Sequence, residues 1–239
     1  MRIIACILSL LLACGPAFAA VTYDAASSSA TTAASSHSYS HTTTSSANRL
    51  MLICVGYEEE SPGVTITAPT YNSVSSTLVA SAEHDDATTI NHISMYKLVA
   101  PATGSNAVAV SLSGAVNAVG IGTITFSDVD QTAPLGTADT NSGFTGVFQS
   151  DINVTGVANG LVADCLNQAS VQAIGNGAGQ TERVDADMGG FFEIAITTSA
   201  ATGTVTMTET WVTDNRFGHI AVPILPVATR RATQPIIFP

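Results

Sequence analysis

The sequence predicts an all-β protein, a single antiparallel β-sandwich of jelly-roll-like form with about 10–13 strands and an extended arm at each end. Turn residues recur at a spacing of roughly 8–15 residues, and the segments between them alternate apolar and polar side chains. Helical periodicity is almost absent. Charged residues make up only 10% of the chain, against a usual value of about 25%. The surface is therefore covered mainly by hydroxyls and amides, as in many secreted β proteins.

The first residues have the features of a signal peptide over 1–19. Arg2 gives a positive start, Ile3–Leu12 is an apolar segment too short to span a bilayer, and Ala17-Phe18-Ala19 has the small-x-small pattern of a cleavage site. The alternative is a lipoprotein signal, in which Leu11-Leu12-Ala13-Cys14 would place the lipid on Cys14. Either reading predicts a secreted or cell-surface protein.

The rest of the chain divides into three parts. Residues 20–35 are rich in Ser, Thr and Ala with few bulky side chains, which predicts an amino-terminal arm. Residues 36–226 carry the strand pattern and form the sandwich domain. Residues 227–239 form a carboxyl-terminal arm that contains Ile236, Ile237 and Phe238. An apolar cluster in an arm needs a surface to cover it, so these three residues are the predicted assembly arm.

The central strand of the domain is Asn48–Tyr57, because Leu50–Val55 is a continuous apolar run of the kind buried on both faces. Before it, His37, Tyr39 and His41 alternate with hydroxyl residues and predict a first strand. Further strands are expected over Val64–Thr67, Thr77–Ala82, Ile90–Ala100, Asn106–Gly114, Gly120–Val129, Phe144–Val154, Gly160–Leu166, Thr181–Ala186, Gly190–Thr198, Thr204–Trp211 and Phe217–Leu225.

Two cysteines lie outside the leader, Cys54 and Cys165, each inside an apolar strand-like run. An exported protein reaches an oxidising compartment, where a disulfide between them is allowed. Two buried free thiols that pack as small apolar side chains are the alternative. The sequence leaves both readings open.

The formal net charge is −11 and the chain contains one lysine, Lys97. A nucleic-acid partner requires a basic face, which this composition does not provide. Arg230 and Arg231 form the one basic pair, and they fall in the carboxyl-terminal arm. No segment after the leader is long and apolar enough for a membrane-spanning helix.

No motif of nucleophilic or zinc catalysis occurs, since Gly-x-Ser-x-Gly, His-Glu-x-x-His and Cys-x-x-Cys are all absent from the sequence. Glu193 and Glu209 lie in apolar strands and are the candidates for a pair of carboxylates, with a structural ion pair to Arg183 or Arg216 as the favoured reading. Residues 58–60 are three glutamates interpreted as a solvated loop. We therefore expect a protein without catalytic residues or an organic cofactor.

Calcium is the metal that the sequence favours, because carboxylates fall in or beside the predicted loops and sandwich loops often bind this ion. No Asp-x-Asp-x-Asp-Gly series occurs. The candidate ligands are Asp85, Asp86, Asp128, Asp130, Asp185 and Asp187.

A series of short segments extends from about Tyr23 to Leu225. It comprises Ser40-His41-Thr42, Asn48-Arg49-Leu50, Thr70-Tyr71-Asn72, Met95-Tyr96-Lys97-Leu98, Ala100-Pro101-Ala102-Thr103-Gly104-Ser105-Asn106, Phe126-Ser127-Asp128-Val129-Asp130-Gln131-Thr132 and Pro134-Leu135-Gly136-Thr137. In order and spacing it resembles a loosely defined group of jelly-roll or Ig-like β-sandwich modules of bacterial secreted proteins and of phage and environmental viral structural proteins. The resemblance implies the sandwich fold and an exported structural or adhesive role. It implies no active site, and the leader departs from a viral structural protein.

The function expected first is that of a non-catalytic secreted structural or adhesive protein that self-assembles by strand or arm exchange. Its partner would be further copies of itself. The alternative is a glycan-binding module for cell-surface sugars, with an exposed aromatic platform drawn from Trp211, Tyr57, Tyr71, Tyr96 and Phe144. A polysaccharide-acting enzyme is the third expectation and requires both glutamates in one cleft.

Overall fold

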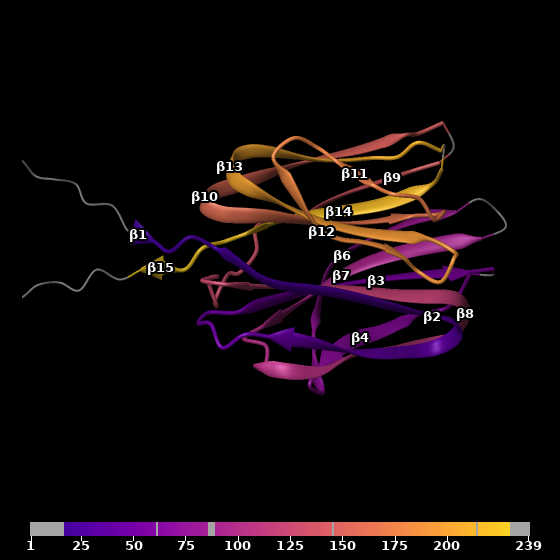
Figure 1. Cartoon of the computed structure of the whole chain (residues 1–239), viewed down its shortest axis with the longest axis horizontal. Coiled ribbons are helices and arrows are strands. Elements are labelled where there is room, and N and C mark those ends of the chain that lie inside the picture. Colours follow the sequence, from indigo (N-terminus) through magenta and orange to yellow (C-terminus); the bar gives the residue numbers. More distant parts are fainter. Residues whose placement is uncertain (1–16, 61, 86–88, 145, 214, 230–239) are drawn as a thin grey trace, which may run out of the picture.

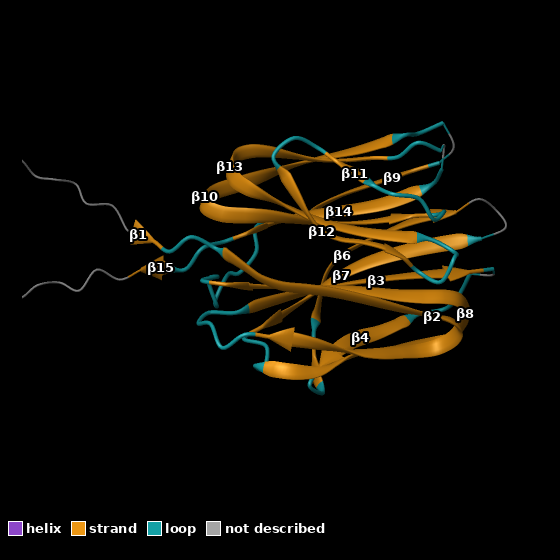
Figure 2. Ribbon diagram, in the orientation of Figure 1, coloured by secondary structure: helices purple, strands orange, loops and turns teal. Residues whose placement is uncertain are grey.

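The computed structural model describes residues 17–60, 62–85, 89–144, 146–213 and 215–229, and these form an all-β protein. Two antiparallel sheets pack face to face as in a β-sandwich, and they occupy the two halves of the molecule in Figure 1. Strands make up most of both halves, and loops gather at the two ends (Figure 2). None of the described residues forms a helix, so none forms a helix able to cross a membrane.

The first sheet contains seven strands in the order β5-β4-β8-β3-β7-β6, and β2 lies along β8. Their bounds are β2 (Thr22–Thr43), β3 (Leu50–Glu59), β4 (Ile66–Tyr71), β5 (Val74–Ser75), β6 (Thr77–Asp85), β7 (Ile90–Val99) and β8 (Gly104–Ser127). The second sheet has the order β11-β13-β10-β14-β9, and β12 pairs with β13. These strands are β9 (Asp139–Gly143), β10 (Gln149–Gln168), β11 (Gly175–Asn176), β12 (Gln180–Asp187), β13 (Glu193–Thr210) and β14 (Phe217–Ile224).

Strands β2 and β8 form a long two-stranded ribbon, here called the first ribbon, which folds back over the outer face of its own sheet. The fold lies where the pairing register shifts, between Ala34 and Ser36. Side chains from the two halves of β2 consequently meet: the Ser27 Oγ and His41 Nδ1 atoms are 2.6 Å apart, although 14 residues separate them. The bend of the first ribbon is visible beside the labels β2 and β8 in Figure 1.

Strands β10 and β13 form a second ribbon that folds over the outer face of the other sheet. Its register shifts between Gly156 and Gly160, and Gly203 has a φ of +71° at the same bend. A Cβ atom on Gly156 would lie 2.6 Å from the Cβ of Ala201, so the strands approach here more closely than a side chain permits. Register shifts of this kind bend and twist strands, and the bend brings Glu209 onto Thr197 of the same strand.

The two sheets and their folded-back ribbons enclose three layers of side chains. Between the sheets lies a core that includes Leu52, Cys54, Phe126, Cys165 and Ile194. A second apolar layer lies beneath the first ribbon; it contains Met51, Ile53, Val55, Tyr57, Tyr71, Tyr96, Leu98, Val108, Val110, Leu112, Val116, Val119 and Ile121. Two smaller clusters lie beneath the second ribbon; they contain Ile152, Val154, Val162, Ala201, Met207 and Ala221, and Leu166, Ile174, Ala195, Trp211 and Phe217.

The central strand β3 is buried along its whole length, as its continuous apolar run predicts. Successive side chains of a strand point to opposite faces. Leu52 and Cys54 therefore join the core between the sheets, whereas Ile53 and Val55 join the layer beneath the first ribbon. An apolar run is needed because both faces of this strand are covered.

The structure differs from the sequence-based division of the chain at the amino-terminal arm, residues 20–35. Residues 22–34 belong to β2 and pair with β8. Small side chains suffice there because Ala26 and Ala30 fill narrow spaces against the core between the sheets, while Ser27 and Ser29 bond to the returning half of the same strand. The absence of bulky residues reflects close packing of two layers.

The two ends of the described chain lie side by side. Strand β1 (Ala17–Phe18) pairs with β15 (Ala228–Thr229), and together they project from one end of the sandwich (Figure 1). Residues 1–16 of the predicted signal peptide lie outside the described residues. Of the predicted arm 227–239, the structure describes only 227–229, so Ile236, Ile237 and Phe238 also lie outside them.

Candidate functional site

A chain of polar side chains is enclosed beneath the second ribbon. The His219 ring lies between two partners: Nδ1 is 2.9 Å from the Ser150 Oγ, and Nε2 is 3.1 Å from the Asp164 Oδ2. Ser150 comes from the folded-back half of β10 and Asp164 from the other half, while His219 lies on β14. The fold-back of the ribbon therefore assembles a Ser-His-Asp series from one strand and its neighbour.

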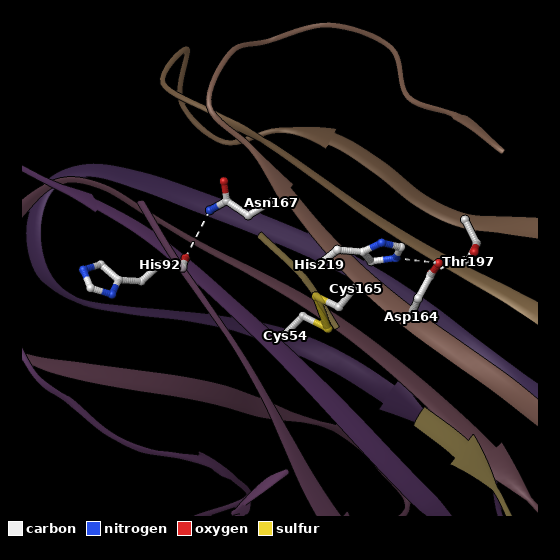
Figure 3. Close-up of a disulfide and its surroundings, with 7 residues drawn as sticks. All are labelled: Cys54, His92, Asp164, Cys165, Asn167, Thr197 and His219. Carbon is white, nitrogen blue, oxygen red and sulfur yellow. Dashed lines mark hydrogen bonds and ion pairs between the residues drawn. A yellow bond between two sulfur atoms is a disulfide. The ribbon is translucent and has the colours of Figure 1, made fainter. Parts of the chain in front are cut away.

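The same chain continues to a second carboxyl group. Thr197 donates from both its backbone nitrogen and its hydroxyl to the Asp164 Oδ1, at 2.7 and 2.8 Å. The Glu209 Oε1 lies 3.0 Å from the Thr197 hydroxyl and 2.9 Å from Gln180 Nε2. Figure 3 shows the Asp164, Thr197 and His219 part of this arrangement beside the disulfide.

The two carboxyl groups differ in charge, because Asp164 is ionised and Glu209 is neutral. Burial opposes ionisation of Asp164, but the hydrogen bond and charge of His219 and the two bonds from Thr197 outweigh it and lower the pKa of Asp164. Burial and the negative charge of Asp164 raise the pKa of Glu209 to about 10. Glu209 is thus a neutral acid beside an ionised aspartate, an arrangement in which two neighbouring carboxyls do not both carry charge.

The order of groups is that of a hydrolase triad, but no substrate reaches it. Ser150, Asp164 and His219 expose 1%, 1% and 0% of their surfaces. A nucleophile must contact a reacting carbonyl, so enclosed groups of this kind serve to satisfy one another and hold the ribbon down. Sequence reasoning missed this network. Its only signals are single polar residues in apolar strands, Asp164 in Val162–Leu166 and His219 in Phe217–Ile224.

The predicted carboxylate pair, Glu193 and Glu209, does not form. Glu193 lies against Asp185, and burial together with that neighbour raises the pKa of Glu193 to about 8. The predicted ion pair of Glu209 with an arginine is also wrong among the described contacts, since Glu209 bonds to Thr197 and Gln180. The Arg183 guanidinium instead covers the Tyr23 ring at 3.9 Å. Both glutamates are buried, and each lies beside an aspartate rather than beside the other.

The calcium candidates are spread over several loops. Asp130 accepts bonds from the backbone nitrogens of Thr132 and Ala133, and these bonds lower its pKa. Asp185 accepts from the nitrogen of Ile174 and Asp187 from that of Gly190. Asp85 ends β6 and Asp128 precedes the bridge residue Val129, while Asp86 lies outside the described residues. Within residues 17–229, apart from the gaps, no three His, Cys, Asp or Glu side chains gather as a metal site.

A groove of about 650 Å³ lies on the outer face of β6 and β7, where the first ribbon does not cover them. Its lining includes Tyr57, Glu83, His92 and Tyr96, with residues 64–66 as one wall. The Tyr57 and His92 rings stack with centroids 4.3 Å apart, and His92 Nε2 lies 2.9 Å from the Glu59 Oε1. The two tyrosines are buried, so their ring faces are covered by protein.

Two of the three glutamates predicted to be a solvated loop are buried at the end of β3. Glu58 and Glu59 are the last residues of β3. Glu58 accepts bonds from the side-chain amides of Asn91 and Asn117, and Glu59 accepts one from the backbone of Val64. The interpretation as a solvated charge run is therefore wrong for these residues, because donors on neighbouring strands satisfy both carboxylates.

The most exposed apolar surface lies on loops at one end of the second sheet. Phe144, Phe148, Val171 and Val212 expose 56%, 51%, 44% and 86% of their surfaces, and we call these four residues the tip patch. All four lie on loops that meet where β14 begins, since Phe217 pairs with Gly143 and with Gln168. Large exposed apolar residues that gather in this way mark interaction surfaces.

Buried partners hold the tip loops in place. Trp211 donates from its backbone to the Phe148 oxygen at 3.0 Å and from its indole to the Val147 oxygen at 2.8 Å. Its ring packs on Phe217 with centroids 5.1 Å apart. Gln172 bonds to the backbone of residues 212 and 213. The tip patch therefore stands on loops that are fixed by Trp211 and Gln172 of the loops themselves and by Phe217 of β14.

A disulfide joins the two sheets through the core between them. It links Cys54 of β3 to Cys165 of β10, whose Cα atoms are 6.4 Å apart (Figure 3). Near it, Asn167 donates to the backbone oxygen of His92 at 3.1 Å, a second connection between the sheets.

Comparison of the chain with family models, curated proteins and solved structures finds no match.

Proposed function

We propose that the protein is a non-catalytic, exported structural or adhesive module that assembles with further copies of itself. The observation that supports this most is that the polar side chains able to do chemistry are buried, whereas a set of apolar side chains is exposed. The one Ser-His-Asp series that we find among the described residues is enclosed, and so are the two candidate glutamates. The apolar tip patch, in contrast, is open to solvent. Its chemistry suits contact with a partner rather than turnover of a substrate.

Two further features support export. Residues 1–19 have the composition of a signal peptide, and the disulfide between Cys54 and Cys165 suits an oxidising compartment. The proposal includes a distant relationship to jelly-roll-like modules of bacterial secreted and viral structural proteins. What supports it is the segment series between about Tyr23 and Leu225 and the two packed antiparallel sheets.

The test is the state of the purified, secreted protein across a range of concentrations, measured by light scattering after size-exclusion chromatography and by negative-stain electron microscopy. We expect mass to increase with concentration and particles to be larger than one chain. A monomer at all concentrations that also binds no cell surface would overturn the proposal. A screen with ester and glycoside substrates that shows turnover lost in Ser150→Ala would overturn its non-catalytic part.

Glycan binding is the second candidate, and exposed aromatic rings at the tip favour it. The platform predicted from the sequence is wrong in four of its five members, because Trp211, Tyr57, Tyr71 and Tyr96 are buried. Phe144 and Phe148 are exposed on the tip loops, and the Gln172 amide bonds to the backbone of Val212 on a neighbouring loop. Aromatic faces beside amides can stack on sugar rings. A glycan array with and without calcium tests this candidate, and an array without binders would count against it.

A further inference from the structure

The tip patch and the paired chain ends lie at opposite ends of the second sheet. Strand β14 connects the two regions: its first residue, Phe217, is at the tip, and its last residue, Ile224, is followed by β15. Val227 bonds to Asp128, and residues 228–229 then pair with β1 beyond the sandwich (Figure 1). The chain after Thr229 therefore starts at the end away from the tip patch.

The segment after Thr229 is too short to return to the tip of its own chain. Phe238, the last of the three apolar residues, follows Thr229 by nine residues, which span at most about 32 Å when fully extended. Phe217 and Ile224, the ends of β14, are seven steps apart and therefore separated by about 23 Å at the rise of a strand. Residues 225–229 add further length away from the tip. The apolar tail residues can reach the tip patch of a second copy but not their own.

The chemistry of the segment matches that surface. Ile236, Ile237 and Phe238 are apolar like the four residues of the tip patch. Arg230 and Arg231 give the segment 230–239 a charge of +2, and since the whole chain carries −11, the remainder carries −13. A basic segment is attracted to a strongly acidic body, which favours contact between copies.

We propose that Ile236, Ile237 and Phe238 of one copy dock on the tip patch of the next copy, head to tail. The inference rests on the self-assembly proposed above and names its interface. Donor and acceptor surfaces differ and lie at opposite ends of the molecule, so the contact is heterologous. Such a contact continues from copy to copy and produces an open filament unless the rotation closes a ring.

The experiment uses two forms of the secreted protein, the full chain and a chain that ends at Thr229, together with a fluorescent peptide of residues 230–239. We expect the shortened chain to stay monomeric and to bind the peptide in an anisotropy titration. Phe144→Ser combined with Phe148→Ser should weaken peptide binding by about tenfold or more, because buried aromatic anchors dominate such contacts. Both side chains are exposed, and the backbone bond of Trp211 to residue 148 is retained.

Two controls separate docking from loss of structure. Leu78→Ser removes an apolar side chain of similar exposure, 52%, from β6 on the other sheet and should leave peptide binding unchanged. In the full chain, Ile237→Asp combined with Phe238→Asp alters only the tail and should abolish assembly. If the full chain assembles but neither the tip nor the tail variants weaken it, the inference is wrong and the proposed self-assembly stands. If the full chain never assembles and the peptide never binds, both fail.

Discussion

The two ribbons fold over their sheets in the same way but enclose different chemistry. Beneath the first ribbon the layer is apolar, and the polar groups beside it are mainly hydroxyls and the histidines His37 and His41, with the Asp24 carboxylate bonded to Thr125. Beneath the second ribbon two small apolar clusters flank the series from Ser150 to Glu209, which contains an ionised carboxylate and a neutral acid. The same backbone arrangement therefore encloses either an apolar layer or a polar series. Most enclosed polar atoms of that series have a hydrogen-bond partner, and the Glu209 Oε2 atom has none among the described residues.

The difference also predicts opposite responses to pH. Burial lowers the pKa of His41 to about 4, although Asp24 acts in the other direction, so the first ribbon requires a neutral imidazole. Burial and Asp164 raise the pKa of Glu209, so the second ribbon requires a protonated acid. Acid should therefore weaken the first ribbon through His41, and alkali should weaken the second through Glu209. Acid also acts on the second ribbon, because the pKa of Asp164 is lowered.

The largest expected effect comes from removing the disulfide that joins the two sheets. Each sheet carries its own ribbon, and the disulfide joins the sheets across a sequence separation of 111 residues. Replacing both Cys54 and Cys165 by Ala should lower the free energy of unfolding by about 4.7 kcal/mol, because the unfolded chain gains freedom. Chemical denaturation of the variant measures this. A loss of unfolding free energy below about 1 kcal/mol would show that the disulfide contributes little to the stability of the two packed sheets.

Breaking the polar series tests the second ribbon directly. Asp164→Ala removes the partner of both His219 and Thr197 and leaves buried groups unsatisfied, which should cost about 3–5 kcal/mol. Asp151→Ala on the exposed face of the same strand is the matched control and should change stability by about 0.5 kcal/mol or less. Equal effects of the two substitutions would contradict the role assigned to Asp164. Urea denaturation with fluorescence detection gives both values.

The pH dependence sharpens the comparison because His41 of the first ribbon contributes to the acid loss of stability and Glu209 of the second ribbon to the alkaline loss. The raised pKa of Glu209 gives stability that is complete below its usual pKa of 4.5 and is lost as pH rises through about 10. The lowered pKa of His41 gives stability that is complete above 6.5 and is lost as pH falls through about 4. Glu193, with a pKa of about 8, adds to the alkaline loss.

Two variants and the fluorescence of Trp211 distinguish the acid loss of stability from the alkaline loss. Glu209→Gln keeps an oxygen for Thr197 and Gln180 and should reduce the alkaline loss of stability, while the acid limb is retained. His41→Gln should reduce the acid limb alone. Trp211, the single tryptophan, lies beneath the second ribbon, so its fluorescence reports that region. An alkaline change in Trp211 fluorescence that persists unaltered in Glu209→Gln would contradict the assignment.

The smallest effect concerns a hydroxyl beneath the first ribbon. The Tyr71 hydroxyl lies 2.9 Å from the Gly104 oxygen and 3.2 Å from the His41 oxygen. Tyr71→Phe keeps the ring and removes the hydroxyl, so we expect a loss of about 1 kcal/mol. Thermal denaturation at neutral pH measures it, and Tyr23→Phe, at a tyrosine that packs against the core between the sheets, serves for comparison. A loss as large as that of Asp164→Ala would remove the contrast between the two ribbons.

The predictions that the structure confirms depend on short-range patterns of apolar and polar residues. The apolar run of β3 predicted a strand covered on both faces, and alternation accounts for the burial of Glu209, which shares a face with Met207 and Trp211. Both inferences depend only on the period of two in a strand. The same reasoning interpreted Glu58 and Glu59 as solvated, because their partners Asn91, Asn117 and His92 are distant in the sequence.

The sequence by itself determined the all-β class and the faces of its strands, since these follow from periodicity and turn residues within a few positions. Only the tertiary structure decided what covers each outer face. The folding of β2 and β10 onto themselves brings Ser27 to His41 and Ser150 to His219. It also places the tip patch opposite the chain ends. A period of two shows which way a side chain points, but its neighbour across a layer depends on bends and register between segments that are far apart in the chain.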